Sequence, residues 1–200
     1  MNFTSLQAVA PYVSRETYDH LCVYHDLLSK WQNKINLVSP STLDDIWSRH
    51  FLDSLQIIPL LDSHTDMTIA DVGCGAGFPG MVISIATHHS VHLIESDQRK
   101  MIFLQEVARH TKSQPVFHVK RSESISIAMD IILSRACANI DKLLAITNGL
   151  RHNKTRYLIH KGVHHQDEIN AALQHWAFDY IVHNSRVQDD SVIIELYNVG

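Results

Sequence analysis

The residues best placed to bind a ligand lie in the stretch DVGCGAGFPG, residues 71–80. It begins with Asp71, and glycines follow at positions 73, 75, 77 and 80. Several glycines in one loop leave the main chain bare, so that a ligand can lie directly against it. The alternative is a tight turn between a strand and a helix that binds nothing.

The spacing of Gly75, Gly77 and Gly80 is G-x-G-x-x-G, which is compatible with a nicotinamide or flavin dinucleotide. Two residues favour a different ligand. Asp71 can meet an ammonium group, directly or through water, but it would repel a pyrophosphate. Phe78 places a ring where a dinucleotide-binding helix exposes its amides.

A second acid, Glu95, follows the glycine loop at roughly the distance of about 20 residues at which an acid binds the hydroxyls of a ribose. S-adenosylmethionine has an adenosine and an amino-acid group but no phosphate. Asp71, the glycines and Glu95 therefore favour S-adenosylmethionine. A dinucleotide-dependent reductase or a non-catalytic nucleotide-binding module remains an alternative.

The chain contains seven short apolar segments that are typical of strands, and these strands position the residues named above. Segments of helical periodicity separate most of the strands. Strands that alternate with helices form a parallel sheet, whereas the last two strands form an antiparallel hairpin. The predicted fold is an α/β, Rossmann-like, seven-stranded doubly wound sheet with an antiparallel C-terminal edge. The predicted strands are 67–72, 91–95, 115–119, 129–134, 155–160, 178–183 and 191–197.

The first part of the chain, residues 1–62, predicts a helical N-terminal extension that packs with the sheet domain, 63–200, as one compact unit. Apolar spacing predicts a helix over 14–36. Thr42 and Asp45 resemble a capping box at the start of a second amphipathic helix, which runs to about Leu55.

Composition indicates a soluble globular protein, with 200 residues, 45% hydrophobic and 19% charged. We expect a cytoplasmic protein, because there is no membrane-spanning run or signal peptide and the three cysteines are far apart. The many histidines lack the spacing of a metal site, so we expect no metal. A net charge of −4 excludes binding to nucleic acid by bulk charge alone, but residues 142–161 hold only basic charges and form either a local basic face or ordinary solvated surface.

Five segments together resemble one family over nearly the whole chain. They are WQNKINLVS (31–39), RHFLDSL (49–55), the glycine loop (71–80), LSRACANI (133–140) and HKG (160–162). The chain is similar in these segments to the bacterial small-subunit rRNA guanine-N7 methyltransferases, known as RsmG or glucose-inhibited division protein B.

The resemblance implies a class I S-adenosylmethionine-dependent methyltransferase that methylates N7 of a guanine in 16S rRNA of the small ribosomal subunit. N7 has an in-plane lone pair and no proton, so the transfer is an in-line displacement that needs no general base. We expect a monomer with no membrane and no obligate protein partner. A class I methyltransferase that acts on a small molecule or a protein is the alternative.

The resemblance also implies cofactor contacts at Gly73, Phe78, Ser122, Glu123 and Arg135, with Ser122 and Glu123 at the adenine, and Glu95 matches its ribose acid.

The residue types and their positions suggest further roles. Arg135 holds either an rRNA phosphate or the cofactor carboxylate, unless it forms a salt bridge with an acid. Arg49 and His50 face the RNA while Asp53 orients Arg49, unless Arg49 and Asp53 form a plain helical ion pair. Lys161 meets a phosphate, unless it is an ordinary exposed lysine.

Three groups of candidate residues follow. The candidate catalytic residues are Arg135, Arg49 and His50, and the candidate RNA-binding residues are Lys161 and Arg49. The candidate cofactor-binding residues are Asp71, Gly73, Gly75, Gly77, Phe78, Glu95, Ser122, Glu123 and Arg135.

Overall fold

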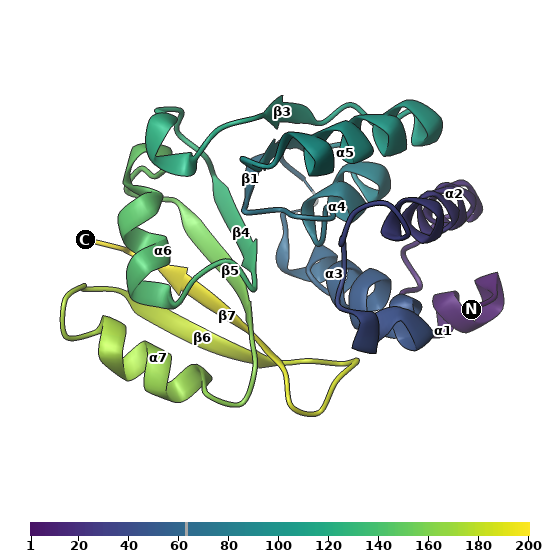
Figure 1. The fold of residues 1–200 in the computed structure, drawn as a ribbon. Coiled ribbons are helices and arrows are strands. Elements are labelled where there is room, and N and C mark those ends of the chain that lie inside the picture. Colours follow the sequence, from purple (N-terminus) through teal and green to yellow (C-terminus); the bar gives the residue numbers. More distant parts are fainter. Residues whose placement is uncertain (63) are drawn as a thin grey trace.

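A seven-stranded sheet forms the centre of the computed structural model, which describes residues 1–62 and 64–200 (Figure 1). The strand order is β3-β2-β1-β4-β5-β7-β6; the first five are parallel and β7 is antiparallel to both neighbours. The predicted fold class is thus confirmed. The strands are β1 (Thr68–Val72), β2 (Ser90–Ile94), β3 (Val116–His118), β4 (Ile131–Arg135), β5 (Arg156–Lys161), β6 (Asp179–Asn184) and β7 (Val192–Tyr197).

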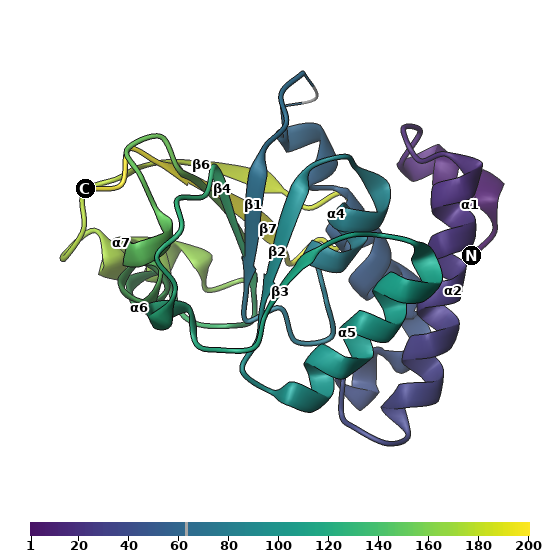
Figure 2. The same ribbon diagram turned by 90° about the horizontal axis from the view of Figure 1, so that it is seen from above.

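Helices cover both faces of the sheet (Figure 2). Alternate residues of a strand point to opposite faces, and Ile69 and Ala70 of β1 accordingly belong to two different hydrophobic clusters. One cluster joins the sheet to α2, α4 and α5, and the other joins it to α6 and α7. The helices are α1 (Phe3–Val9), α2 (Arg15–Gln32), α3 (Asp53–Leu55), α4 (Gly80–Ala86), α5 (Gln98–Thr111), α6 (Ile140–Ile146) and α7 (His165–Ala172).

The second N-terminal helix is less regular than its apolar spacing predicts. The segment consists of a 3-10 helix (Pro40–Asp45), a π-helix (Trp47–Leu52) and the short α3. The predicted capping box is wrong, because the Thr42 hydroxyl donates to the carbonyl of Ser39 at 2.7 Å. Of the helices in the described part of the chain, none is long and apolar enough to cross a membrane.

The parallel register brings the ends of four strands to the same edge of the sheet. Val72 pairs with Ile94 across β1 and β2, and Arg135 pairs with His160 across β4 and β5. The loops that follow these strands therefore lie side by side. Ligands of open α/β sheets bind at this edge.

Candidate functional site

A cavity of about 740 Å³, here called the larger pocket, opens at this edge. Its wall includes the glycine loop, part of the π-helix, the end of β5 and the segment 135–139. A smaller pocket of about 180 Å³ adjoins it, and Gly73, Glu95, Cys137 and Ala138 line both. The two pockets therefore form one elongated site, with Glu95 at the junction.

The glycines of the loop have different roles. Gly75 has a left-handed φ of +56°, and a Cβ there would come no closer than 3.9 Å to a neighbouring atom, so its main chain faces the larger pocket. Gly73 lies on the wall of both pockets. A Cβ on Gly77 would lie 2.6 Å from both Leu104 and the Tyr24 hydroxyl. Gly77 lines neither pocket, so it is not the ligand contact that was predicted. It is needed instead for close packing against Leu104 and Tyr24.

The amides of the loop are largely engaged within the protein. Those of Gly73 and Cys74 donate to the carbonyl of Ile94 at 3.0 and 3.1 Å. The amide of Gly75 donates to Glu95 Oε2 at 3.1 Å. An anion in the larger pocket therefore finds these donors already occupied.

The prediction that Asp71 faces the ligand needs correction. Its side chain is fully buried, it lines neither pocket, and its Oδ2 accepts from the amide of Gly80 at 2.7 Å. Its Oδ1 is buried with no partner among the described residues. Burial raises the pKa of Asp71 to about 7, although the Gly80 hydrogen bond acts in the opposite direction. The carboxylate of Asp71 thus binds the first amide of α4 from the interior of the protein and faces neither pocket.

Three residues predicted to bind the cofactor, Glu95, Ser122 and Glu123, lie along the elongated site. Glu95 accepts from the amides of Gly75 and Asp97, at 3.1 and 2.9 Å, and lines both pockets. A carboxylate has about four lone-pair positions, so some remain for a ligand. Ser122 and Glu123 line the smaller pocket, where the hydroxyl of Ser122 donates to Glu123 at 3.3 Å.

Phe78 connects the glycine loop to the helical N-terminal region. Its ring stacks on Tyr24 of α2 with centroids 5.2 Å apart and on His50 at 4.9 Å. The Tyr24 hydroxyl also donates to the carbonyl of Ala76. Phe78 lines the larger pocket but is only 3% exposed, so its main role is to pack the glycine loop against Tyr24 and His50.

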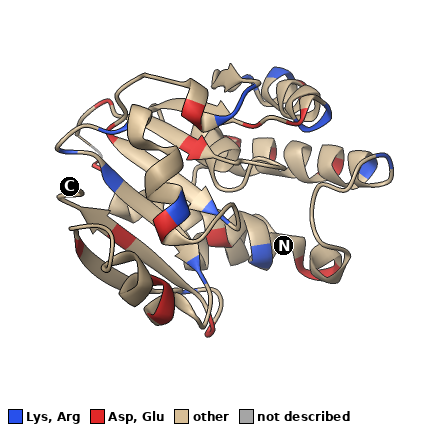
Figure 3. Ribbon diagram, turned by 60° about the vertical axis from the view of Figure 1, so that its left-hand side comes forward, with Lys and Arg blue, Asp and Glu red and all other residues tan. Residues whose placement is uncertain are grey.

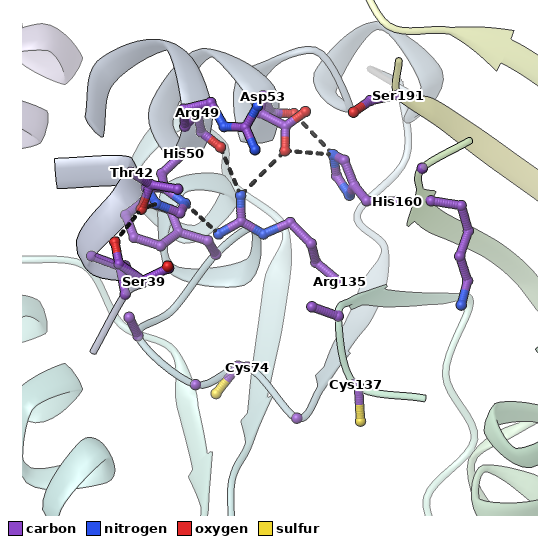
Figure 4. Close-up of a pocket in the computed structure, with 18 of the residues that line it drawn as sticks. Ser39, Thr42, Arg49, His50, Asp53, Cys74, Arg135, Cys137, His160 and Ser191 are labelled. Carbon is purple, nitrogen blue, oxygen red and sulfur yellow. Dashed lines mark hydrogen bonds and ion pairs between the residues drawn. The ribbon is translucent and has the colours of Figure 1, made fainter. Parts of the chain in front are cut away.

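Arg135, at the end of β4, is held by the segment that contains the π-helix (Figure 4). Its Nη1 donates to the carbonyl of Arg49 at 3.0 Å and to Asp53 Oδ2 at 3.2 Å, and its Nη2 donates to His50 at 2.8 Å. The guanidinium lies 5.1 Å from the centre of the Phe78 ring. The alternative of a salt bridge with an acid is thus correct, and the acid is Asp53.

His50 is a neutral link between Arg135 and a pocket wall. A guanidinium can only donate, so His50 Nδ1 accepts from Arg135, and Nε2 carries the proton that is donated to Thr42 at 2.9 Å. Burial and the positive charges of Arg135 and Arg49 lower the pKa of His50 to about 3. His50 is 8% exposed, so it is not the open RNA-facing side chain that was expected.

Asp53 does not orient the side chain of Arg49. Besides Arg135, it accepts from Gln56 at 2.8 Å, and its carbonyl oxygen lies 2.9 Å from Nε2 of buried His160. The helical ion pair between Arg49 and Asp53 and the orientation of Arg49 by Asp53 are therefore both wrong. Arg49 is an exposed residue that lines the larger pocket.

Lys161 is neither a free cation nor an ordinary exposed lysine. Its ammonium donates to the carbonyl of Ala138 at 2.7 Å and lies 2.6 Å from Glu168 Oε2. Its side chain is only 10% exposed. The expected phosphate contact would have to compete with these two partners.

The basic segment 142–161 does not form one basic face either. Arg156 pairs with Glu195 at 2.7 Å, and Arg151 lies over the ring of Trp176 at 4.9 Å. Figure 3 shows Lys and Arg interspersed with Asp and Glu around the ribbon. With Lys161 paired with Glu168 as well, two positive charges of the segment are paired with acids and a third lies over an aromatic ring.

Three partners in this site were missed by sequence reasoning: Thr42, His160 and Glu168. Each contacts a predicted residue from another element, and His160 and Asp53 are 107 positions apart in the chain. No local pattern in one sequence identifies such pairs.

Comparisons with known proteins agree on one family. Residues 17–192 match the family described as rRNA small subunit methyltransferase G. A relative of that name from Orientia tsutsugamushi (strain Ikeda) is 42% identical over 184 residues, 92% of each chain. Another, from Paramagnetospirillum magneticum, is 43% identical over 165 residues, 82% of this chain and 80% of the relative.

Solved structures support the fold. Magnesium protoporphyrin IX methyltransferase from Synechocystis PCC 6803 with bound SAH has a TM-score of 0.63 at 12% identity, over 89% of this chain and 99% of that one. A TehB-like SAM-dependent methyltransferase from Corynebacterium glutamicum has a TM-score of 0.58 at 15% identity, over 88% and 98%. At these identities the likeness concerns the fold alone.

Proposed function

Because the chain belongs to the rRNA small subunit methyltransferase G family, we propose that it transfers a methyl group from S-adenosylmethionine to N7 of a guanine in 16S rRNA. The small ribosomal subunit is then its partner. We propose that it acts in the bacterial cytoplasm, as a monomer without an obligate protein partner.

The geometry fits the cofactor along the elongated site. Ser122 and Glu123 of the smaller pocket offer polar groups to the adenine, and Glu95 at the junction offers lone pairs to the ribose hydroxyls. The bare main chain at Gly73 and Gly75 leaves room for the amino-acid part in the larger pocket. These residues would hold S-adenosylmethionine.

The observation that carries this assignment is the hydrogen bond from the Gly80 amide to Asp71. A pyrophosphate of a dinucleotide binds the free amides at the start of this helix. Here the buried carboxylate of Asp71 already occupies one of these amides. The site therefore favours an adenosine ligand without phosphates over a dinucleotide.

The larger pocket also suits a reaction without proton abstraction. S-adenosylmethionine, when bound, supplies a methyl group on a positively charged sulfur, which a lone pair can attack directly. Three of the acid–base side chains that line this pocket are already engaged: His50 uses both ring nitrogens, Asp53 is paired with Arg135, and Glu168 is paired with Lys161. The side chains hold the reactants in line instead, and positioning of this kind contributes about 7–11 kcal/mol in favourable cases.

The acceptor guanine would enter the larger pocket beside residues 37–42. The guanine must be unpaired or flipped out of its RNA helix to enter the larger pocket. Arg49, exposed on the wall, is placed to meet an RNA phosphate, while His50 holds the guanidinium of Arg135. We propose that Arg135, besides its salt bridge with Asp53, meets an RNA phosphate or the cofactor carboxylate.

The test is mass mapping of methylated guanine in 16S rRNA. Small subunits that lack the mark are incubated with the protein and labelled S-adenosylmethionine. Label at one guanine, on N7, is expected. Calorimetry with S-adenosylmethionine and NAD(P) accompanies it, and tight NAD(P) binding without a response to S-adenosylmethionine would overturn the assignment.

A further inference from the structure

Lys161 and Glu168 pair with each other and hold one short segment at two points. The ammonium of Lys161 donates to the carbonyl of Ala138 at 2.7 Å and pairs with Glu168 at 2.6 Å. The same Glu168 oxygen accepts from the amide of Ile140 at 3.2 Å. The last residue of β5 and a residue of α7 thereby fix the main chain on both sides of position 139.

This segment continues from the loop that lines both pockets. Cys137 and Ala138 lie in the wall of each pocket, and a Cβ on Gly73 would lie 2.5 Å from Cys137 Sγ. The loop is thus packed directly against the glycine loop. A shift of the loop would change the shape of the site where the two pockets meet.

The loop is also strained. Ala136 has a φ of +53°, in the left-handed region that disfavours side chains with a Cβ. A residue keeps such a conformation only where its surroundings enforce it. The contacts of Lys161 and Glu168 begin two residues further on and supply that constraint.

We propose that Lys161 and Glu168 form a latch that keeps the loop 136–139 in the conformation that binds S-adenosylmethionine. Both are positioning residues, because they act through the loop. The inference rests on the proposed function for the identity of the cofactor. It assigns Lys161 a role different from the phosphate contact that its position in the sequence suggests.

The two roles predict effects of removing Glu168 on different ligands. If Lys161 binds RNA phosphate, loss of the neighbouring acid frees the ammonium and strengthens RNA binding. If the pair is a latch, loss of either partner weakens the binding of S-adenosylmethionine in the absence of RNA. Lys161→Met, Glu168→Ala and the double variant test this in the full-length protein.

Calorimetry with S-adenosylmethionine gives the first readout. We expect each single variant to raise the Kd about tenfold and the double variant to raise it no further, as for residues that act as a unit. Lys161→Arg keeps a cation and its donors and should recover most of the affinity. Lys154→Met removes an exposed lysine of the neighbouring turn and should leave the Kd unchanged.

Hydrogen exchange of the free protein gives a readout that needs no ligand. The amide of Ile140 should exchange faster in Glu168→Ala, while the amides of β4 keep their protection. If wild-type protein does not bind S-adenosylmethionine, the proposed function fails and this exchange experiment still decides the latch. Unchanged exchange and Kd in Lys161→Met and Glu168→Ala, or fully additive effects of the two, would overturn it.

Discussion

The carboxylate of Asp71 accepts a hydrogen bond of 2.7 Å from the main-chain amide of Gly80. The two residues stand at opposite ends of the glycine loop, so this contact closes the loop from within the protein. A Cβ on Gly80 would lie 2.6 Å from the Asp71 Cβ, so Gly80 is needed for the approach. The contact occupies the amide at the start of α4 and places an acid in the interior.

Replacement of that acid should change how stability depends on pH. Burial raises the pKa of Asp71 in the folded protein to about 7, above its unfolded value of about 4. Between these values the unfolded chain releases the proton first, so the contribution of Asp71 to stability falls as pH rises from 4 to 7. Relative to wild type, Asp71→Asn should gain up to ~1 kcal/mol per pH unit in that window. Urea unfolding at pH 4.5, 6 and 8 measures this, and a difference that does not change with pH would contradict it.

Two glycines of the loop should respond differently to alanine. Gly75→Ala adds a methyl group on the side of the larger pocket and should raise the Kd for S-adenosylmethionine at least tenfold, with a stability loss of only about 1–2 kcal/mol from its positive φ. Gly77→Ala forces a contact with Leu104 and Tyr24 and should mainly lower the melting temperature. Calorimetry and thermal unfolding of both variants separate the roles. Equal Kd values for Gly75→Ala and wild type would place the ligand elsewhere.

Stability and turnover should separate at Arg135. Arg135→Met leaves the Asp53 carboxylate, 6% exposed, without its cation, which costs about 3–5 kcal/mol. Adding Asp53→Asn removes the buried charge and should restore most of the stability. Turnover on small subunits should stay low in the double variant, because Arg135 is still absent. If the double variant recovered turnover together with stability, the role of Arg135 would be only structural.

His50 should make the folded protein sensitive to acid. Its pKa of about 3 lies below the unfolded value of about 6.5, so the unfolded chain binds the proton first and stability is lost as pH falls through this window. His50→Gln keeps an acceptor for Arg135 but does not titrate. Wild type should therefore lose up to ~1 kcal/mol more than the variant per pH unit below 6.5. Denaturant titrations of both proteins at pH 6.5 and 4.5 provide the comparison; parallel losses would rule out a buried neutral imidazole.

The sheet and its ligand edge could be predicted because their signals are local. Each strand has its own apolar run, and the predicted 67–72 differs from β1, Thr68–Val72, by one residue. Alternation with helices then gives parallel strands. Glu95 and Gly75 followed from the same reasoning, since the ends of neighbouring parallel strands meet.

The partners of charged residues could not be predicted in this way. The spacing of Arg49 and Asp53 assumes an α-helix, whereas residues 47–52 form a π-helix with a different side-chain spacing. Asp53 instead pairs with Arg135, 82 positions away. Lys161 likewise has no acid beside it in the strand and finds Glu168 on the next helix. Such pairs form only when separate elements pack together, and the sequence of one element does not show which other element it will contact.

The contact of Tyr24 with the carbonyl of Ala76 and the ring of Phe78 has an evolutionary consequence. The N-terminal helices hold the outer side of the glycine loop, so they are not an interchangeable module. A chimera that exchanged residues 1–62 for an unrelated segment would lose the part of the larger pocket's wall that these residues form. A change of target is therefore expected through point substitutions that leave the contact between Tyr24 and Phe78 in place.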